Sequence, residues 1–260
     1  MYVGPPATFA PSVRLFRMPA TQLQFLGHAA FRLTSPEGRV ILIDPWFTNN
    51  PFVPAHLWQP EQADLVLITH GHDDHFDPEL PGLLARTGAR CIAQPQVRFY
   101  LYEQDVPAAQ FEPMNKGGSV EVLGVRVTMT LAFHGAHIDL PDGTAGFPHE
   151  GVGFILRFSD GAVVYAAGDT ALFGDMRLLA QLYRPQVALL PIGDRYTMGP
   201  LEAAHAARLL ATPHVVPFHY GTYPALTGTP AQLQAHFTSA DNVTVHALQA
   251  GETLDLGTLR

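Results

Sequence analysis

Short apolar runs, separated by polar segments rich in Gly and Pro, dominate the hydrophobic pattern of the chain. Most of these runs are rich in β-branched or aromatic side chains, which is typical of buried strands. The run Leu65-Val66-Leu67-Ile68 shows this most clearly. The pattern predicts strands over residues 22–31, 39–44, 65–68, 90–93, 119–123, 125–132, 152–158, 162–166, 187–190, 214–217, 243–247 and 253–256.

Longer amphipathic stretches lie between several of these strands and predict helices. Strands form hairpins in some places, as around the turn Ser159-Asp160-Gly161, and alternate with helices in others, which predicts a mixed α/β fold. Residues 138–151, rich in Gly and Pro, are expected to form a loop. We expect an irregular, proline-containing arm over residues 1–20 and a single domain over residues 21–260. The predicted helices cover residues 78–86, 97–104, 173–183, 200–210 and 230–237.

Histidine or aspartate stands at the end of many predicted strands. In layered α/β folds, the loops at one edge of a sheet converge on a common site, so these side chains can meet although they are distant in the sequence. The residues concerned are Asp44, His70, His72, His134, Asp169 and His219.

The densest cluster is His70-Gly71-His72-Asp73-Asp74-His75, directly behind the apolar run 65–68. In an extended segment, residues two apart point the same way, so His70 and His72 can reach one point together. Asp74 and His75 follow as the chain turns and can reach a second point nearby. Neutral imidazole and carboxylate are ligands of zinc and related metals. The alternative is a solvated, histidine-rich turn, but this spacing behind a buried strand favours a metal site.

Two further candidates follow apolar strands in the second half of the chain. Asp169, in Ala167-Gly168-Asp169-Thr170, is either the N-cap of the following helix or a carboxylate that projects into a cleft and bridges two cations. His219 follows Val215-Val216-Pro217-Phe218 and, together with the cluster at residues 70–75, becomes a candidate metal ligand.

Three other histidines have less certain roles. His134 and His137 compete for one ligand position, and His134 is preferred because it lies nearer the end of its strand. His28 interrupts the first predicted strand. It either hydrogen-bonds to Asp44 or to a metal-bound carboxylate, or it is a satisfied core residue.

Composition restricts the partners and the location that the protein is expected to have. The net charge is −8 with only 15 Lys and Arg residues, which argues against nucleic acid as the main partner. Cys91 is the only cysteine, so an internal disulfide is excluded and a buried structural thiol is expected. No apolar run approaches the roughly 20 residues that span a membrane, and no secretory leader is recognised, so we expect a cytoplasmic location.

Several motifs together resemble the metallo-β-lactamase superfamily. The motifs are Phe25-Leu26-Gly27-His28-Ala29, Leu42-Ile43-Asp44-Pro45, Thr69-His70-Gly71-His72-Asp73-Asp74-His75, Gly168-Asp169-Thr170, Pro191-Ile192-Gly193, Thr197-Met198-Gly199-Pro200 and Pro217-Phe218-His219-Tyr220-Gly221-Thr222. Within that superfamily they are most similar to a bacterial branch of metal-dependent hydrolases related to the ascorbate-6-phosphate lactonases. The resemblance covers about residues 22–256 and implies a four-layer αβ/βα sandwich with metals at the edge between two β-sheets.

The resemblance also implies a set of metal ligands. One ion would be bound by His70, His72 and His134, the other by Asp74, His75 and His219, with Asp169 bridging them. The sequence departs from the usual pattern in two places. Asp194 stands where a small residue, typically Gly, is expected, and Gly135 stands where Ser often follows the ligand histidine.

These features predict a hydrolase with two divalent ions, foremost Zn²⁺, with Mn²⁺ or Fe as alternatives. A hydroxide shared by the ions would attack an ester, lactone, amide or phosphodiester of a small-molecule substrate, while Asp74 and Asp169 orient it and accept its proton. An iron-dependent oxidoreductase and a non-catalytic metal-binding protein are the alternatives, and homo-oligomerisation is left open. The expected substrate contacts are Tyr196, Tyr220, Tyr223, Arg195 and the turn 197–200 as an anion site.

Overall fold

Two β-sheets form the centre of the protein in the computed structural model, which describes residues 19–259. Most of the expected arm over residues 1–20 therefore lies outside the described residues. The first sheet has the strand order β13 (Thr253–Asp255), β1 (Gln22–Gly27), β2 (Ala30–Thr34), β3 (Val40–Ile43), β4 (Leu65–Leu67) and β5 (Arg90–Ile92). The second has the order β12 (Thr244–Val245), β11 (His214–Phe218), β10 (Val187–Pro191), β9 (Val163–Ala166), β8 (Ala145–Arg157), β7 (Val125–Asp139) and β6 (Ser119–Val122).

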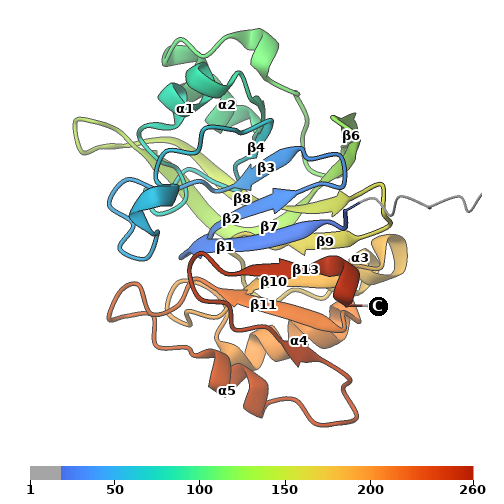
Figure 1. The fold of residues 1–260 in the computed structure, drawn as a ribbon. Helices are drawn as coiled ribbons and strands as arrows, with labels where there is room; N and C mark the ends of the chain where they lie inside the picture. The colour runs from blue at the N-terminus through green and yellow to red at the C-terminus, as the bar shows by residue number, and fades with distance from the viewer. Residues whose placement is uncertain (1–18, 260) are drawn as a thin grey trace, which may run out of the picture.

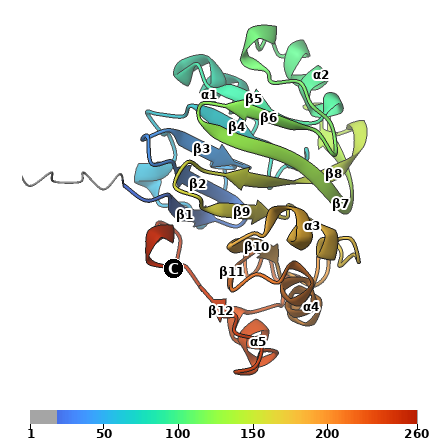
Figure 2. The same ribbon diagram turned by 90° about the vertical axis from the view of Figure 1, so that its right-hand side faces the viewer.

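Helices cover the outer faces of both sheets. Figures 1 and 2 show α1 and α2 on one side of the molecule and α4 and α5 on the opposite side, with the strands between them. The helices are α1 (Leu80–Thr87), α2 (Pro95–Glu103), α3 (Met176–Tyr183), α4 (Pro200–Leu210) and α5 (Pro230–Ala235), with short 3₁₀ helices at Ala55–Leu57, Ala108–Gln110 and Leu256–Thr258. The result is the four-layer αβ/βα sandwich that the family resemblance implied.

The apolar runs of the sequence are continuous because their strands are buried on both faces. In β4, Leu65 and Leu67 pack into the core between the two sheets, whereas Val66 packs into a second core beneath α1 and α2. A third core lies between the second sheet and its helices, and small side chains such as Ala204 of α4 allow the helix to approach closely. Cys91 of β5 is fully buried, which confirms a structural thiol, and burial raises its pKa to about 12.

The structure corrects three details of the predicted elements. Residues 22–31 are not one strand: β1 and β2 form an antiparallel hairpin that turns at His28 and Ala29. The expected loop over 138–151 is mostly paired, because β7 and β8 continue through it, with register shifts that accommodate the extra residues. Helix α3 begins at Met176, three residues later than predicted.

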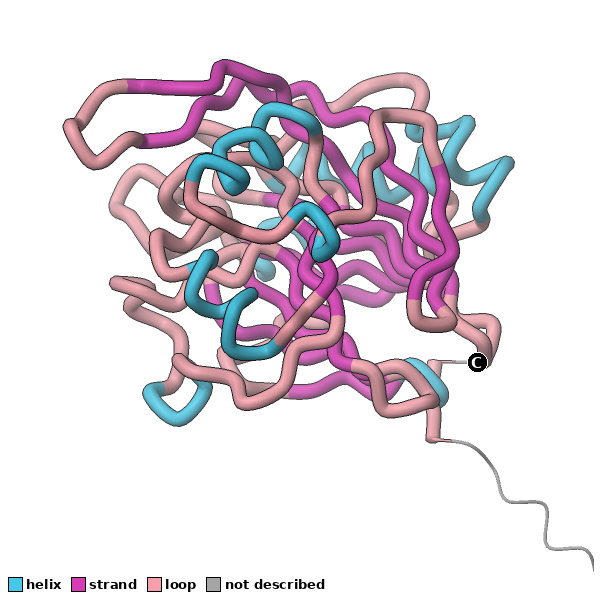
Figure 3. The backbone as a smooth tube through the Cα atoms, turned by 90° about the horizontal axis from the view of Figure 1, so that it is seen from above, coloured by secondary structure: helices cyan, strands magenta, loops and turns pink. Residues whose placement is uncertain are grey.

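The site lies at one edge of the sandwich. Strands β3, β4 and β5 are parallel, as are β9, β10, β11 and β12, so the carboxyl ends of each set lie at one edge of its sheet. The loops after β3 (blue) and after β10 and β11 (orange) lie together on the left of Figure 1, and Figure 3 shows the loops of this side from above. Within residues 19–259, no helix is long and apolar enough to cross a bilayer.

Candidate metal centre

The chain turns sharply after β4 and presents the cluster at residues 70–75 in two directions. His72 O accepts hydrogen bonds from His75 N at 3.0 Å and from Phe76 N at 2.8 Å, so the backbone reverses within this segment. His70 and His72 therefore face one point, and Asp74 and His75 reach a neighbouring one, as the spacing predicted.

His70, His72 and His134 form the first group of side chains able to bind a metal. His134 Nε2 lies 3.2 Å from His72 Nδ1, and the His70 and His134 rings are 4.9 Å apart. His137 lies outside this group, and its Nε2 is instead 3.2 Å from Asp139 Oδ1. The structure thus places His134 in the group with His70 and His72, whereas His137 is not in it although its ring is 5.1 Å from that of His72.

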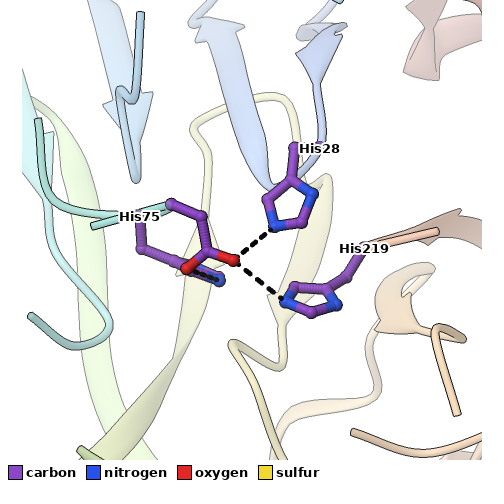
Figure 4. A group of neighbouring side chains, drawn as sticks. His28, His75 and His219 are labelled. Carbon is purple, nitrogen blue, oxygen red and sulfur yellow. Dashed lines mark hydrogen bonds and ion pairs between the residues drawn. The ribbon is translucent and has the colours of Figure 1, made fainter. Parts of the chain in front are cut away.

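Asp74, His75 and His219 form the second group, which also contains His28. Figure 4 shows the rings of His28, His75 and His219 around one carboxylate, which the distances identify as Asp74. Asp74 Oδ2 lies 3.1 Å from His28 Nε2 and 3.7 Å from His219 Nε2, and Asp74 Oδ1 lies 3.9 Å from His75 Nε2.

Asp169 lies between the two groups and is only 2% exposed. Its Oδ2 is 3.0 Å from His219 Nε2 and 3.7 Å from His134 Nε2, and its Oδ1 is 3.3 Å from His75 Nε2. The alternative role as a helix N-cap does not apply, because α3 begins only at Met176. Asp169 therefore contacts members of both groups.

Asp44, at the end of β3, holds His75 in place. Asp44 Oδ2 lies 2.8 Å from His75 Nδ1 and accepts a hydrogen bond from Thr69 Oγ1 at 2.6 Å, while Oδ1 accepts one from Thr69 N at 2.8 Å. Because the carboxylate takes the Nδ1 hydrogen, His75 Nε2 faces the cluster and can bind a cation once its own hydrogen is lost. Asp44 thus contacts His75, and not His28, which bonds to Asp74.

Three residues of the cluster have a strained backbone. His28, Asp44 and His219 have φ angles of 55°, 44° and 57°, in the left-handed region that non-glycine residues rarely adopt. His219 N also donates a 2.9 Å hydrogen bond to His28 O, which joins the ends of β1 and β11. The two sheets are thus connected directly at the cluster.

The chemistry of the cluster fits a divalent metal. His70 Nε2, His75 Nε2 and Asp169 Oδ1 are buried, and none of them makes a hydrogen bond within the part of the chain that the structure describes, although the last two face each other at 3.3 Å. Buried polar atoms without a partner are costly and therefore rare in folded proteins. Cations at the centre of the cluster would provide partners for all three atoms.

The electrostatics of the cluster favour metal binding at neutral pH. Burial lowers the pKa of His72 to about 4 and lowers the pKa of His70 well below its ordinary value. Burial alone would raise the pKa of Asp169, but the facing His219 and His75 lower it well below its ordinary value. The two histidines are therefore neutral and the aspartate ionised, which are the forms that bind metal ions.

The metal-free protein is expected to be most stable near pH 6.5. His28 and His72 have pKa values of about 4 in the folded chain against an ordinary value of 6.5, so the unfolded chain binds more protons as the pH falls from 6.5 towards 4. Burial would lower the pKa of His75, but Asp169 and Asp44 raise it well above 6.5. The folded chain therefore keeps this proton above pH 6.5, and stability declines again as the pH rises through the raised pKa.

Melting temperatures of chelator-treated protein across this range test the expectation. Each proton changes the free energy of unfolding by at most about 1.4 kcal/mol per pH unit, and by less for the partly exposed His72, whose charge is screened by solvent. The acid side should be steeper, since several histidines contribute there. A melting temperature that keeps rising above pH 6.5 would contradict the raised pKa of His75.

Of the expected substrate contacts, Tyr223 lies closest to the cluster. Its ring is 5.9 Å from that of His28, and its side chain is 41% exposed. Tyr220 packs partly against the core beneath α4, and Tyr196 is 62% exposed. Within residues 19–259, Arg195 makes no hydrogen bond or ion pair.

The start of α4 is a poor anion site. A Cβ atom at Gly199, the N-cap, would lie 3.1 Å from both Asp194 Oδ1 and Glu202 Oε2, so two carboxylates already face this helix end. Asp194 has a φ of 80°, a conformation that favours glycine, which explains why a small residue is expected there. A Cβ atom at Gly135 would meet nothing within 4 Å, so a serine would fit at that position.

Thr222 is part of the site but was not among the expected residues. Its Oγ1 lies 2.7 Å from His28 Nδ1. His28 and Thr222 are separated by 194 positions, and no periodicity or spacing links them. Only the position of Thr222 three residues after His219, in the same loop, could have indicated it.

Comparison with known proteins identifies similar chains. A family model described as a β-lactamase superfamily domain matches residues 22–219. A protein of Rubrobacter xylanophilus named a metal-dependent hydrolase is 48% identical over 235 residues, covering 90% of this chain and 96% of the relative. A protein of the same name from Herpetosiphon aurantiacus is 41% identical over 237 residues, covering 90% and 98%. The solved structure of a metallo hydrolase from Ignicoccus hospitalis is 34% identical, with a TM-score of 0.76, and the match covers 90% of this chain and 97% of that one.

Proposed function

The chain belongs to the β-lactamase superfamily of metal-dependent hydrolases, and we propose that it uses a binuclear centre to cleave an ester, lactone, amide or phosphodiester bond of a small-molecule substrate. The observation that carries this proposal is the place of Asp169. It is buried, and its two oxygens face His75 on one side and His134 and His219 on the other. A carboxylate that contacts two ligand groups is suited to bridging two ions.

The proposal assigns the ligands as follows. His70, His72 and His134 would bind one ion, Asp74, His75 and His219 the other, and Asp169 both. Two divalent ions held there would lower the pKa of a shared water towards neutrality and polarise the bond to be cleaved. The predominance of imidazole ligands favours Zn²⁺, with Mn²⁺ and Fe as the alternatives.

Asp74 is the carboxylate of the cluster best placed to act on the attacking water. Its side chain is 17% exposed, against 2% for Asp169, so it lies on the side open to solvent. His28 contacts Oδ2, while Oδ1 lies 3.9 Å from His75 Nε2, and from this position Asp74 would orient the attacking water and accept its proton. Asp169 would hold the same water from the buried side.

Tyr223→Phe is expected to lower kcat by roughly tenfold to a hundredfold with little change in KM. Burial raises the pKa of Tyr223 to about 12, and Asp74 and Asp73 add to the rise, so the phenol stays protonated at neutral and moderately alkaline pH. It can then donate a hydrogen bond to a substrate oxygen that gains negative charge. Loss of a fully enclosed donor of this kind costs about a hundredfold to a thousandfold in kcat, and a smaller loss is expected for Tyr223 because its side chain is 41% exposed. Steady-state kinetics measure the change.

Tyr102→Phe is the matched control for this variant. Tyr102 is also partly exposed, at 36%, but it lies on α2 and packs against Phe111, away from the cluster. The control should retain wild-type kcat. Equal activity of the Tyr223 variant and the wild type would remove Tyr223 from the proposed mechanism.

Metal analysis followed by a hydrolysis panel tests the proposed function. Elemental analysis should find about two transition-metal ions per chain. The loaded protein is then assayed against lactones, thioesters, β-lactams and phosphodiesters, before and after treatment with a chelator, and after metal is restored. We expect hydrolysis of at least one class that is lost with the chelator and regained with metal.

Two outcomes would contradict the proposal. Iron-dependent redox activity with no hydrolysis would favour an oxidoreductase. A fully loaded protein that hydrolyses nothing in the panel would favour a non-catalytic metal-binding role.

A further inference from the structure

His28 occupies an unusual position beside the second ligand group. It is 1% exposed and stands in the turn between β1 and β2 with a left-handed backbone. Its ring packs 5.4 Å from that of Trp46 and 4.3 Å from that of His219, which restricts its rotation. The ligand set proposed above does not use it.

Both nitrogens of this ring have partners. His28 Nε2 lies 3.1 Å from Asp74 Oδ2, and His28 Nδ1 lies 2.7 Å from Thr222 Oγ1. Figure 4 shows the His28 ring aimed edge-on at the carboxylate. Thr222, from the loop after β11, thus reaches Asp74, from the loop after β4, through a single imidazole.

The hydrogen atoms in the two hydrogen bonds of His28 can be assigned from donor and acceptor chemistry. An ionised carboxylate only accepts, so the hydrogen between His28 and Asp74 must be on Nε2. A neutral imidazole carries one such hydrogen, so Nδ1 must accept. The hydroxyl of Thr222 is then the donor to Nδ1. In this series of hydrogen bonds Thr222 therefore donates to His28, and His28 donates to Asp74.

We propose that His28 and Thr222 are positioning residues that fix the orientation of Asp74 for the second metal ion. The Thr222 hydroxyl donates to His28 Nδ1 and holds the ring in place, and the Nε2 hydrogen of His28 holds Asp74 Oδ2, which turns Oδ1 towards His75. This role rests on the proposed binuclear centre. It differs from a role of His28 as a metal ligand, which would require a free lone pair on Nε2 and a hydrogen on Nδ1.

The test uses Co²⁺ as the probe metal and five single-substitution variants of the full chain, of which Asp74→Ala removes a proposed ligand and is the reference for loss of an ion. Thr222→Val removes the hydroxyl, Thr222→Ser keeps it, and His28→Gln keeps an N–H near the position of Nε2. Thr212→Val is the matched control, because Thr212 is also buried and its hydroxyl hydrogen-bonds at the other end of β11, to Gln186 O and His214 O. Circular dichroism confirms that each variant is folded. Competition with a chelator gives the affinity of each ion, and the visible spectrum of bound Co²⁺ reports its coordination.

We expect Thr222→Val to weaken, by roughly tenfold, binding of the same ion that Asp74→Ala loses, within the range found when a partner of a metal ligand is lost. Thr222→Ser should restore the affinity and the spectrum, His28→Gln should retain most of the affinity, and Thr212→Val should match the wild type. Wild-type affinity in Thr222→Val would overturn the proposal. Loss of the ion from His28→Gln as complete as from Asp74→Ala would also overturn it, because the ring would then be a ligand. A wild-type protein that binds only one Co²⁺ would contradict the binuclear centre itself, and this role of His28 with it.

Discussion

Asp169→Asn is expected to lower kcat/KM by about a thousandfold or more and to reduce the bound metal from about two ions per chain to about one or fewer. The asparagine keeps the shape of the side chain but loses the charge, and one of its two oxygens becomes an NH₂ group that cannot bind a cation. Loss of the two-metal centre removes several kcal/mol of transition-state stabilisation, and each 1.4 kcal/mol is a factor of ten in rate. Elemental analysis and steady-state kinetics measure the two effects.

Asp73→Asn provides the matched control. Asp73 belongs to the same motif and carries the same charge, but its side chain is exposed and it is in neither ligand group. This variant should keep its metal and nearly all of its activity. An Asp169→Asn protein that still holds two ions would show that this carboxylate does not bridge them.

The parts of the site that could be predicted from sequence are those encoded locally. His70 and His72 share a face because they are two residues apart after a strand, and Asp74 and His75 follow in a turn. The convergence of His219 on the same point also follows from a general rule, since the ends of parallel strands meet at one edge. The alternation of strands and helices likewise predicted the α/β class, which the structure confirms.

The choice between His134 and His137 depends on β-bulges that the sequence does not reveal. Two residues three apart on a regular strand would point to opposite faces. Strand β7 shifts register between Leu131 and Gly135, and again between Ala136 and Ile138, so simple alternation fails in this segment. The same shifts extend the pairing of β7 with β8 into the region that was expected to be a loop.

The surroundings of the ligands depend on contacts between distant segments. Asp44 supports His75, and His28 supports Asp74, because the ends of β1, β3 and β4 meet at the cluster. The left-handed backbone of His28 and Asp44 makes these contacts possible, yet the local sequence around the two residues does not predict this conformation. The candidate ligands were therefore easier to predict than the residues proposed to orient them.

Asp44→Ala is expected to destabilise the metal-free protein by about 3–5 kcal/mol, the range for removal of one partner from a buried charged pair. Asp44 is 2% exposed and accepts hydrogen bonds from Thr69 N, Thr69 Oγ1 and His75 Nδ1. An alanine leaves these buried donors without an acceptor. Because His75 also loses the partner that orients its ring, the affinity for the second ion should fall by about ten- to a hundredfold.

Asp77→Ala separates the two effects, since Asp77 is equally buried but lies away from the ligand groups. It is 2% exposed, and it accepts hydrogen bonds from Phe47 N and Thr48 N at 2.6 Å and from Glu79 N at 2.8 Å. Chemical denaturation should show a similar loss of stability in both variants, whereas chelator competition under native conditions should show weaker metal binding only in Asp44→Ala. Equal metal affinity in the two variants would mean that Asp44 stabilises the fold without orienting His75. Loss of buried hydrogen bonds alone would then account for the behaviour of both variants.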